Sequence, residues 1–278
     1  MAESYYLNIA GLRFHMKSTA PMKLPKCFQP FLTAEAPVDV SIELFPGAEK
    51  ICPQGTQVGK NVYSTEAGIL QRYLWKDEQY FVRIEPMDRP GFCRLGIPEE
   101  FFPDFCNGGN WLKLLAIERL LMPFGRAVIH AAGVILDGKA YLFVAASEGG
   151  KSTQANLWEQ RGAEILNGDK IILSQEEAFW YAWGSPVAGS SGIYKNKRAP
   201  LAAVFMVNKS PENSGMRLSK RNGFLHLYSN AVKSEWDCEF NVQLLNLLEK
   251  VAMKIPVYQL NCNMELSAVD CALECLKG

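Results

Sequence analysis

Apolar and polar residues alternate along much of the first part of the chain. In the segment 38–45, the residues Val38, Val40, Ile42 and Leu44 fall on one side of an extended backbone, which predicts a strand with one buried face. The segments 68–77 and 79–87 have a similar apolar character, and the polar residues between them predict the turn of a hairpin. The pattern therefore predicts a smaller β-rich N-terminal region, to which we assign residues 1–109.

The hydrophobic spacing changes near residue 110. Residues 110–125 carry apolar side chains at helical spacing, with Asn110 as a candidate N-cap and Gly125 just beyond the end. Strands and helices then alternate, which is typical of a mixed α/β domain, and we assign it residues 110–278. The expected strands are 127–136, 140–146, 163–166, 170–174, 178–186, 200–209 and 257–262, and the expected helices are 151–162, 240–255 and 264–277.

Two histidines and one aromatic cluster carry no predicted chemistry. His15 and His226 fall in segments that we interpret as ordinary strands or strand edges. The aromatic run 179–183 contains no interleaved basic residues, so sheet packing explains it better than stacking on nucleobases.

Composition and charge exclude several classes of partner. The chain has 278 residues with 29 basic and 29 acidic side chains, so no net positive charge attracts nucleic acid or an anionic membrane. No apolar run approaches the roughly 18–20 residues that span a bilayer. The eight cysteines are scattered without zinc-ligand spacing, and no export signal precedes them, which predicts a reducing, cytoplasmic location.

The segment SEGGKST at 147–153 is the strongest candidate for chemistry. It follows an apolar strand and begins a helical pattern, as a phosphate-binding P-loop does. Ser147, Glu148, Gly149 and Gly150 would supply backbone amides, Lys151 a cation, Ser152 a hydroxyl for Mg²⁺, and Thr153 would follow in the first helical turn. The match is incomplete, because Ala145 stands where the usual pattern has its first glycine. A polar turn that contains a lysine by chance is the alternative.

Asp169 is the candidate metal-binding carboxylate. Mg²⁺ prefers hard oxygen ligands and takes one or two carboxylates beside substrate phosphates. Asp169 follows the first strand after the P-loop helix, so it faces Ser152 if that strand lies beside the P-loop strand. The alternative is a structural turn, since Asn-Gly-Asp is also good turn chemistry.

Residues 125–270 resemble the catalytic core of HPr kinase/phosphorylase and its relatives in the PEP-carboxykinase-like P-loop family. The resemblance rests on a histidine-containing strand with His130, the Asp137-Gly138 turn, the P-loop, Arg161-Gly162 and Asp169. The later segments 184–207 and 255–269 are also similar to shorter HPr-kinase-like proteins of peptide-modification gene sets. The resemblance implies a PEP-carboxykinase-like P-loop core behind the β-rich region.

The resemblance also implies roles for individual residues. Lys151, Asp169 and His130 would be catalytic, and Ser152 with Asp169 would bind Mg²⁺. In the family an aspartate pair serves the metal and proton transfer, but here the first of the pair falls on Gly168. Ser190, Lys195 and Arg198 lie in a small-residue loop that corresponds to one near the nucleotide, although a solvated surface loop is the alternative.

Two functions follow as hypotheses. The first is a kinase that uses Mg²⁺ and ATP, or another nucleoside phosphate or phosphoryl donor, to phosphorylate a hydroxyl, with serine on a peptide, small protein or amino acid as the expected acceptor. The second is a nucleotide-binding regulator or chaperone of a peptide-modifying enzyme that transfers phosphate weakly or not at all. Carboxykinase-like decarboxylation is a weaker third, because no Lys/His pair for further metal ligands is evident. Homo-oligomers remain open, and no nucleic-acid or membrane partner is expected.

Overall fold

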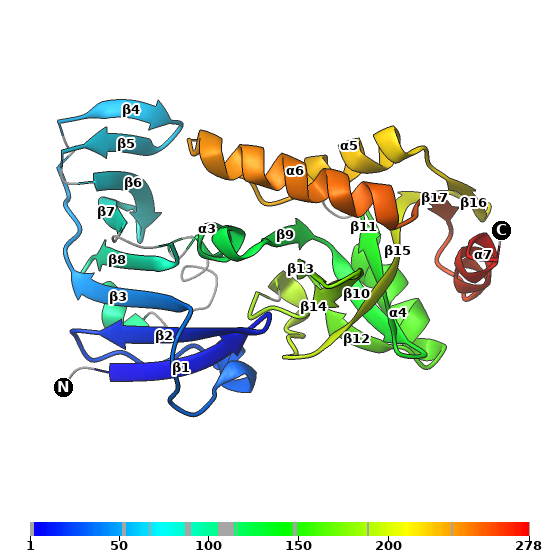
Figure 1. The fold of residues 1–278 in the computed structure, drawn as a ribbon, viewed down its shortest axis with the longest axis horizontal. Coiled ribbons are helices and arrows are strands. Elements are labelled where there is room, and N and C mark those ends of the chain that lie inside the picture. The colour runs from blue at the N-terminus through cyan, green and yellow to red at the C-terminus, as the bar shows by residue number, and fades with distance from the viewer. Residues whose placement is uncertain are drawn as a thin grey trace. The chain divides into compact units, whose positions relative to one another are not determined.

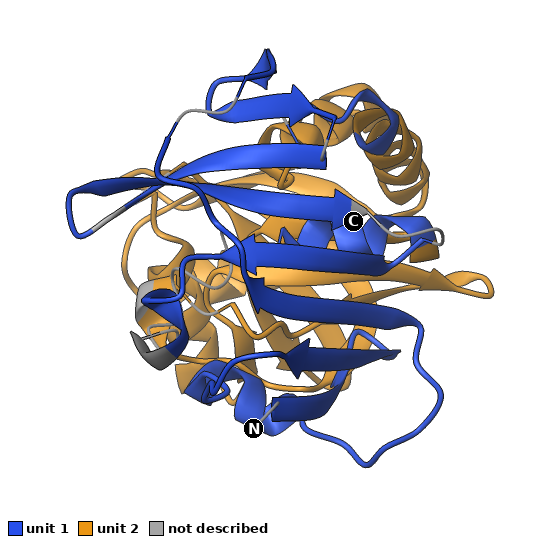
Figure 2. Ribbon diagram, turned by 90° about the vertical axis from the view of Figure 1, so that its left-hand side faces the viewer, with its two compact units in different colours: residues 1–123, 234–240 blue, residues 124–233, 241–278 orange. Residues whose placement is uncertain are grey.

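The computed structural model describes residues 3–51, 54–66, 68–86, 90–104, 114, 116–146, 149–187, 189–234 and 236–277. The chain divides into two compact units, one of residues 1–123 with 234–240 and the other of residues 124–233 with 241–278 (Figure 2). The fold is mixed α/β, with one sheet in each unit and a β-rich N-terminal region. The boundary that the sequence placed between residues 109 and 110 lies outside the described residues and stays a prediction.

The first unit is built on an eight-stranded sheet in the order β1-β2-β3-β8-β7-β6-β5-β4 (Figure 1). Its strands are β1 (Glu3–Ile9), β2 (Leu12–Ser18), β3 (Val40–Pro46), β4 (Thr56–Gly59), β5 (Val62–Thr65), β6 (Gly68–Trp75), β7 (Glu78–Pro86) and β8 (Phe92–Ile97). Short helical segments accompany them: η1 (Lys26–Phe31), α1 (Phe101–Asp104), α3 (Ile117–Leu121) and η2 (Met122–Phe124), which ends at the junction with the second unit. Strand β3 pairs in parallel with β2 and β8, whereas the other neighbours are antiparallel.

Buried and more exposed side chains alternate along β3 of the first sheet, as the sequence pattern predicts. Val40, Ile42 and Leu44 on β3 are all buried, as predicted, but Val38 precedes the strand and is half-buried. The β6–β7 hairpin is confirmed, and its turn residues Lys76 and Asp77 both have positive φ, the geometry of a tight two-residue connection. Of the predicted helix 110–125, the structure describes α3, while Asn110 lies outside the described residues.

The second unit contains the predicted chemistry. Its strands are β9 (Arg126–His130), β10 (Ala132–Leu136), β11 (Lys139–Val144), β12 (Glu164–Asn167), β13 (Lys170–Glu176), β14 (Phe179–Trp183), β15 (Arg198–Lys209), β16 (Ser214–Arg217) and β17 (Val257–Cys262). Its helical segments are α4 (Lys151–Gln160), η3 (Gly189–Ser191), α5 (Lys220–Asn230), α6 (Cys238–Lys254, whose first turn belongs to the other unit) and α7 (Ser267–Cys275). The sheet order is β12-β10-β11-β15-β14-β13-β9, and β17 adds to β15 with β16 beyond it.

Strand direction brings several strand ends to one edge of this sheet. Strands β11, β15 and β17 are parallel to one another. Strand β12 runs the same way, because it is antiparallel to β10 and β10 is antiparallel to β11. The carboxyl ends of β12, β11, β15 and β17 therefore meet at one edge, where ligands bind in open α/β sheets.

Helix α4 is anchored on the sheet by an aromatic cluster. Trp158 is fully buried, and its ring centroid lies 4.9 Å from that of Tyr141, 5.4 Å from that of Phe143 and 6.1 Å from that of Phe205. Burial of such large rings is worth about 1.5–3 kcal/mol each, so these contacts hold α4 against β11 and β15.

Two expectations about the second unit are wrong. The segment 127–136 is not one strand: it breaks at Ala131 into β9, which pairs with β13, and β10, which pairs with β11 and β12. His226 lies on helix α5 rather than on a strand, and Ser219 caps that helix by accepting a hydrogen bond from the Asn222 amide. His15 does lie on a strand, β2, where its ring stacks on Tyr6.

Candidate functional site

Gly149 and Gly150, called the glycine loop from here on, lie between the end of β11 and the start of α4, the order that the P-loop prediction requires. The Gly149 amide donates to the Ala146 carbonyl over 2.9 Å, and Gly150 has a φ of +102°, which only glycine adopts without strain. A β-carbon on Gly149 would lie 2.7 Å from the Ala145 β-carbon, so the loop is too tight for a side chain there. Ser147 and Glu148, predicted to contribute amides, lie outside the described residues.

The beginning of α4 has the character of an anion site. Gly150 is its N-cap residue, and no side chain among the described residues caps the helix. The first amides of an uncapped helix point outward without partners and carry partial positive charge. Ser152 is exposed and Thr153 half-buried in this first turn. Such an arrangement can bind phosphate oxygens.

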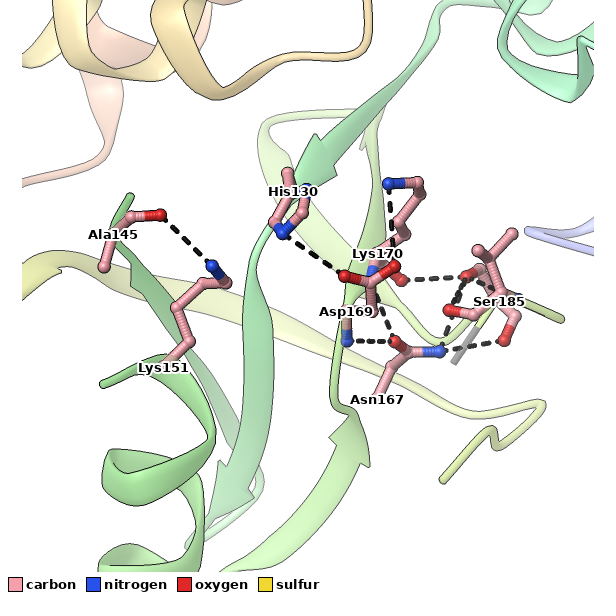
Figure 3. A network of polar contacts seen from close by, with 8 residues as sticks. His130, Ala145, Lys151, Asn167, Asp169, Lys170 and Ser185 are labelled. Carbon is pink, nitrogen blue, oxygen red and sulfur yellow. Dashed lines mark hydrogen bonds and ion pairs between the residues drawn. The ribbon is translucent and has the colours of Figure 1, made fainter. Parts of the chain in front are cut away.

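Lys151 is buried at the start of α4, with 8% of its surface exposed. Its Nζ donates to the Ala145 carbonyl over 3.1 Å and to the Ala146 carbonyl over 3.3 Å, so the ammonium reaches back to the end of the strand (Figure 3). Burial lowers the pKa of Lys151 below its ordinary value of 10.5, while the charge of Asp169 acts in the opposite direction. The Lys151 ammonium is therefore partly desolvated and lies beside the end of β11.

Asp169 is held by a turn that Asn167 builds. The buried Asn167 side chain accepts hydrogen bonds from the amides of Asp169, over 2.8 Å, and Lys170, over 2.9 Å, and donates to the Ser185 carbonyl over 2.9 Å (Figure 3). The Ser185 hydroxyl in turn donates to the Lys170 carbonyl over 2.8 Å. Turn chemistry and a carboxylate role are therefore compatible, because Asn167 makes the turn and leaves the Asp169 carboxylate available.

His130 faces Asp169 because the strand breaks after it. The Ala131 amide donates to the Asp169 carbonyl over 3.0 Å, and His130 pairs with Lys170 in the β9–β13 register. This places His130 Nε2 3.2 Å from Asp169 Oδ1, while Lys170 Nζ lies 3.6 Å from Asp169 Oδ2 (Figure 3). With a proton on Nε2 facing the carboxylate, Nδ1 carries the lone pair that can accept a proton.

Burial and neighbouring positive charges favour a neutral His130 imidazole. Burial lowers the pKa of His130 below its ordinary 6.5, and the positive charges of Lys170 and Lys151 lower it further, against the opposing effect of Asp169. His130 is then uncharged at neutral pH and able to act as a base.

The predicted Mg²⁺ ligands fit a magnesium ion only in part. Among the described residues no group of three or more His, Cys, Asp or Glu side chains is arranged to hold a metal. Mg²⁺, however, commonly takes one carboxylate and completes its shell with phosphates and water. The predicted adjacency of the two strands is wrong, because β10 lies between β12 and the strand β11 that precedes the glycine loop. The Asp169 carboxylate and the exposed Ser152 hydroxyl remain the predicted oxygen ligands, and a complete set would require the phosphates of a bound ligand.

The second predicted loop lies against Asp169, but its basic residues have carboxylate partners. Gly189 has a φ of +54°, and a β-carbon there would lie 2.8 Å from Asp169 Cγ, so η3, which includes Ser190, passes close to the carboxylate. Lys195 Nζ lies 2.8 Å from Glu164 Oε1. Arg198 pairs with Glu176, and its guanidinium lies 4.5 Å from the Tyr181 ring centroid. The predicted phosphate contacts of Lys195 and Arg198 would have to compete with these carboxylates.

Sequence reasoning missed several residues at this edge. The sequence pattern predicts only a turn at Asn167 and no role for Lys170, although both contact Asp169. Gln154, Lys209 and Met264 line a pocket beside the glycine loop, and they come from α4, β15 and the segment after β17. Only the helical spacing of Gln154 from Lys151 could have indicated a shared face.

Comparisons with known proteins give little further support. No protein-family model matches the chain, and no curated protein matches its sequence. One similar solved structure is the HPr(Ser) kinase/phosphatase from Coxiella burnetii, with 13% identity and a TM-score of 0.32, covering 54% of this chain and 99% of that one. With a TM-score this low, the likeness says nothing about the activity of this chain. No helix in the described part of the chain is long and apolar enough to cross a membrane.

Proposed function

We propose that this protein is a nucleotide- and Mg²⁺-dependent kinase with a PEP-carboxykinase-like P-loop core, and that it transfers a phosphoryl group to a hydroxyl, with serine on a peptide, small protein or amino acid as the expected acceptor. The observation that carries the proposal is the convergence of Lys151 and the His130–Asp169 pair at one edge of the sheet. Asp169 acts on the pKa of Lys151 and contacts His130 directly, so the cation, the carboxylate and the base belong to one electrostatic cluster.

The chemistry needs little more than position and charge. The acceptor oxygen forms a bond to the terminal phosphorus while the bond from phosphorus to the bridging oxygen breaks, and the diphosphate leaves. Lys151 and the α4 amides stabilise charge on the phosphate oxygens. His130 takes the hydroxyl proton on Nδ1, while Asp169 fixes the ring and stabilises the imidazolium that forms.

Magnesium would add charge neutralisation between the phosphates. Asp169 and Ser152 are the residues that would hold it, as the ligand preferences of Mg²⁺ suggest. Lys170 Nζ lies 3.6 Å from Asp169 Oδ2, so Mg²⁺ would compete with this ammonium for the carboxylate.

The test is phosphoryl transfer by the full chain. The protein is incubated with Mg²⁺ and γ-labelled ATP, with L-serine and a mixture of serine-containing peptides as acceptors. We expect Mg²⁺-dependent label on an acceptor, and its loss in Lys151→Met and His130→Gln. Equal transfer by wild type and both variants would contradict the assignment of the site.

A regulator that binds nucleotide without turnover is the second candidate. Gly168 and Ala145 favour it, because they stand where the resembled family has an aspartate and a glycine. Both candidates require Lys151 for nucleotide binding, so binding does not separate them. Steady ADP formation that depends on an acceptor hydroxyl would exclude the regulator, and tight binding without any ADP formation would favour it.

A further inference from the structure

Helices α5 and α6 of the second unit leave a groove between them (Figure 1). Its volume of about 460 Å³ lies in the roughly 300–1,000 Å³ range of ligand pockets. Among its lining residues are three from each helix: Lys220, Arg221, Phe224, Leu245, Glu249 and Met253. None of these residues belongs to the candidate site described above, so this α5–α6 groove is a second place on the same unit.

Helix α6 is apolar on its outer side as well as on its inner side. On the inner side, Leu244 and Leu248 are fully buried. On the opposite side, Val242, Leu245 and Met253 recur at helical spacing, and Val242 is 56% exposed and Met253 53% exposed. A surface helix of a globular protein carries polar residues opposite its buried stripe. The outer apolar stripe of α6 therefore indicates a surface that takes a partner.

Helix α5 repeats this arrangement on its side of the groove. Gly223 and Leu227 are buried, and a β-carbon on Gly223 would lie 3.0 Å from Val257, so this side packs on β17. Phe224 and Leu225 lie on other sides of the helix, where Phe224 is half-buried in the groove and Leu225 is 51% exposed. Both helices thus present apolar side chains at the surface.

The groove is positively charged near the start of α5. A smaller hollow continues it, because Lys220 lines both, and Arg217 and Lys254 line this hollow. With Arg221, four cations stand against one carboxylate, Glu249, in a chain that has no net charge. Arg217, Arg221 and Lys254 make no ion pair with any described residue, so these charges are available to a partner. Complementarity then requires a partner that carries carboxylates.

Helix α5 also connects the groove to the candidate site. The helix ends at Asn230, and the next residue, Ala231, pairs with Ile129 beside His130. The 11 residues of α5 give it a length of about 16 Å. An extended chain spans at most about 3.3–3.6 Å per residue, so at least about five residues must separate a group in the groove from one at His130.

We propose that the α5–α6 groove docks an acidic, apolar segment of the peptide or protein whose hydroxyl is phosphorylated. This inference rests on the proposed function and deepens it, because it selects a peptide or protein over a free amino acid as the acceptor. Apolar side chains of the segment pack on Phe224, Leu245 and Met253, and its carboxylates pair with Arg221 and Lys254. The phosphorylated serine lies at least about five residues from the segment.

The first test is retention of peptide libraries by the immobilised full chain. One library of peptides of about twelve residues is randomised over Glu, Asp, Leu, Phe and Ala, and the second has Lys and Arg in place of the two acids. We expect wild type to retain the acidic library at least about fivefold better at low salt, and this preference to weaken as salt is added. Met253→Asp and Arg221→Glu should abolish the preference. Phe179→Asp and Lys139→Glu are matched controls at exposed positions outside the groove and should behave like wild type.

The second test is phosphoryl transfer to a retained acidic peptide that is joined to a serine by a glycine-serine linker. With a linker of about ten residues, we expect a KM at least about tenfold below that of L-serine, whereas a linker of about two residues is too short to give this advantage. Met253→Asp should raise the KM of the long-linker peptide by about 3–10-fold and leave kcat and the KM for MgATP unchanged. No KM advantage at either linker length would overturn the assignment of the docked segment to the acceptor.

The outcomes separate this inference from the proposed function. Equal retention of the acidic library by wild type and Met253→Asp would overturn the docking surface and leave the proposed function standing, as would equal retention of the two libraries by wild type. A dimer that Met253→Asp dissociates, without retention of either library, would assign the groove to a second copy of the chain and overturn the inference. Retention that Met253→Asp abolishes, without transfer to any acceptor, would support the docking of an acidic segment and contradict the proposed function.

Discussion

Replacement of Lys151 by methionine should separate phosphate binding from stability. Methionine keeps an unbranched, apolar stem in a position that is 8% exposed, and it removes only the ammonium. In the free protein that ammonium donates to two neutral carbonyls at 3.1 and 3.3 Å, and a bound phosphate would replace them with anionic acceptors. Because burial already disfavours the charged form, the loss of the charge offsets part of the loss of these bonds.

The expected magnitudes differ for binding and for folding. Hydrogen bonds to charged groups contribute about 1.5–3 kcal/mol, so binding of a non-hydrolysable MgATP analogue should weaken by roughly 10–150-fold. The free energy of unfolding should change by less than about 1.5 kcal/mol, because the unbranched methionine side chain still packs where the lysine stem lay.

The assay is calorimetric titration together with urea denaturation. Lys139→Met is the matched control, because Lys139 is exposed at the other end of β11 and should tolerate the change in both measurements. Unchanged nucleotide affinity in Lys151→Met, in a protein that remains folded, would refute the assignment of Lys151 to phosphate.

Three further predictions concern the rest of the site. Asn167→Ala should lower the free energy of unfolding by about 1–3 kcal/mol, because the partly buried amides of Asp169 and Lys170 lose their acceptor. It should also reduce transfer by releasing Asp169, and a change below about 0.5 kcal/mol in urea denaturation would contradict this role. Gly149→Ala should cost about 1–3 kcal/mol through the clash with Ala145 and weaken MgATP binding, and wild-type affinity in the titration would argue against a tight loop. The rate of transfer should rise with pH through an inflection below 6.5, as His130 loses its proton, and then level off. If the pH profile of kcat/KM keeps this inflection in His130→Gln, the titrating group is not His130.

The element order of the second unit was largely predictable because its periodicity is strong. Helix α4 begins at Lys151 as the sequence indicated, and the strand β17 and the helix α7 follow the predicted pattern. The Asp-Gly turn between β10 and β11 was equally readable, since Asp137 and Gly138 both have positive φ. Local patterns are sufficient for features of this kind.

The break at Ala131 was not predictable from a local pattern. The segment 127–136 is apolar apart from His130, and a strand that changes partner leaves no signature in hydrophobicity. It depends on a bond between the Ala131 amide and the Asp169 carbonyl, residues far apart in the sequence. This break brings His130 into contact with Asp169. The sequence named both residues as candidates, but it did not predict that they touch.

The helix α5 and the pocket were missed for related reasons. The segment around His226 contains β-favouring aromatic residues and a glycine, but Ser219 caps it and Gly223 lets it approach Val257, where a β-carbon would lie 3.0 Å away. The pocket joins residues from α4, β15 and the end of β17, and only the strand order brings these segments together. Tertiary pairing decided both features.

The most direct measurement of the central claim is a crystal structure of the full chain with Mg²⁺ and a non-hydrolysable ATP analogue. The account predicts phosphate oxygens against the amides at the start of α4, Lys151 Nζ turned from the Ala145 carbonyl to the phosphates, and Mg²⁺ between Ser152 and Asp169. A triphosphate bound elsewhere, with Lys151 still on the Ala145 carbonyl, would contradict it.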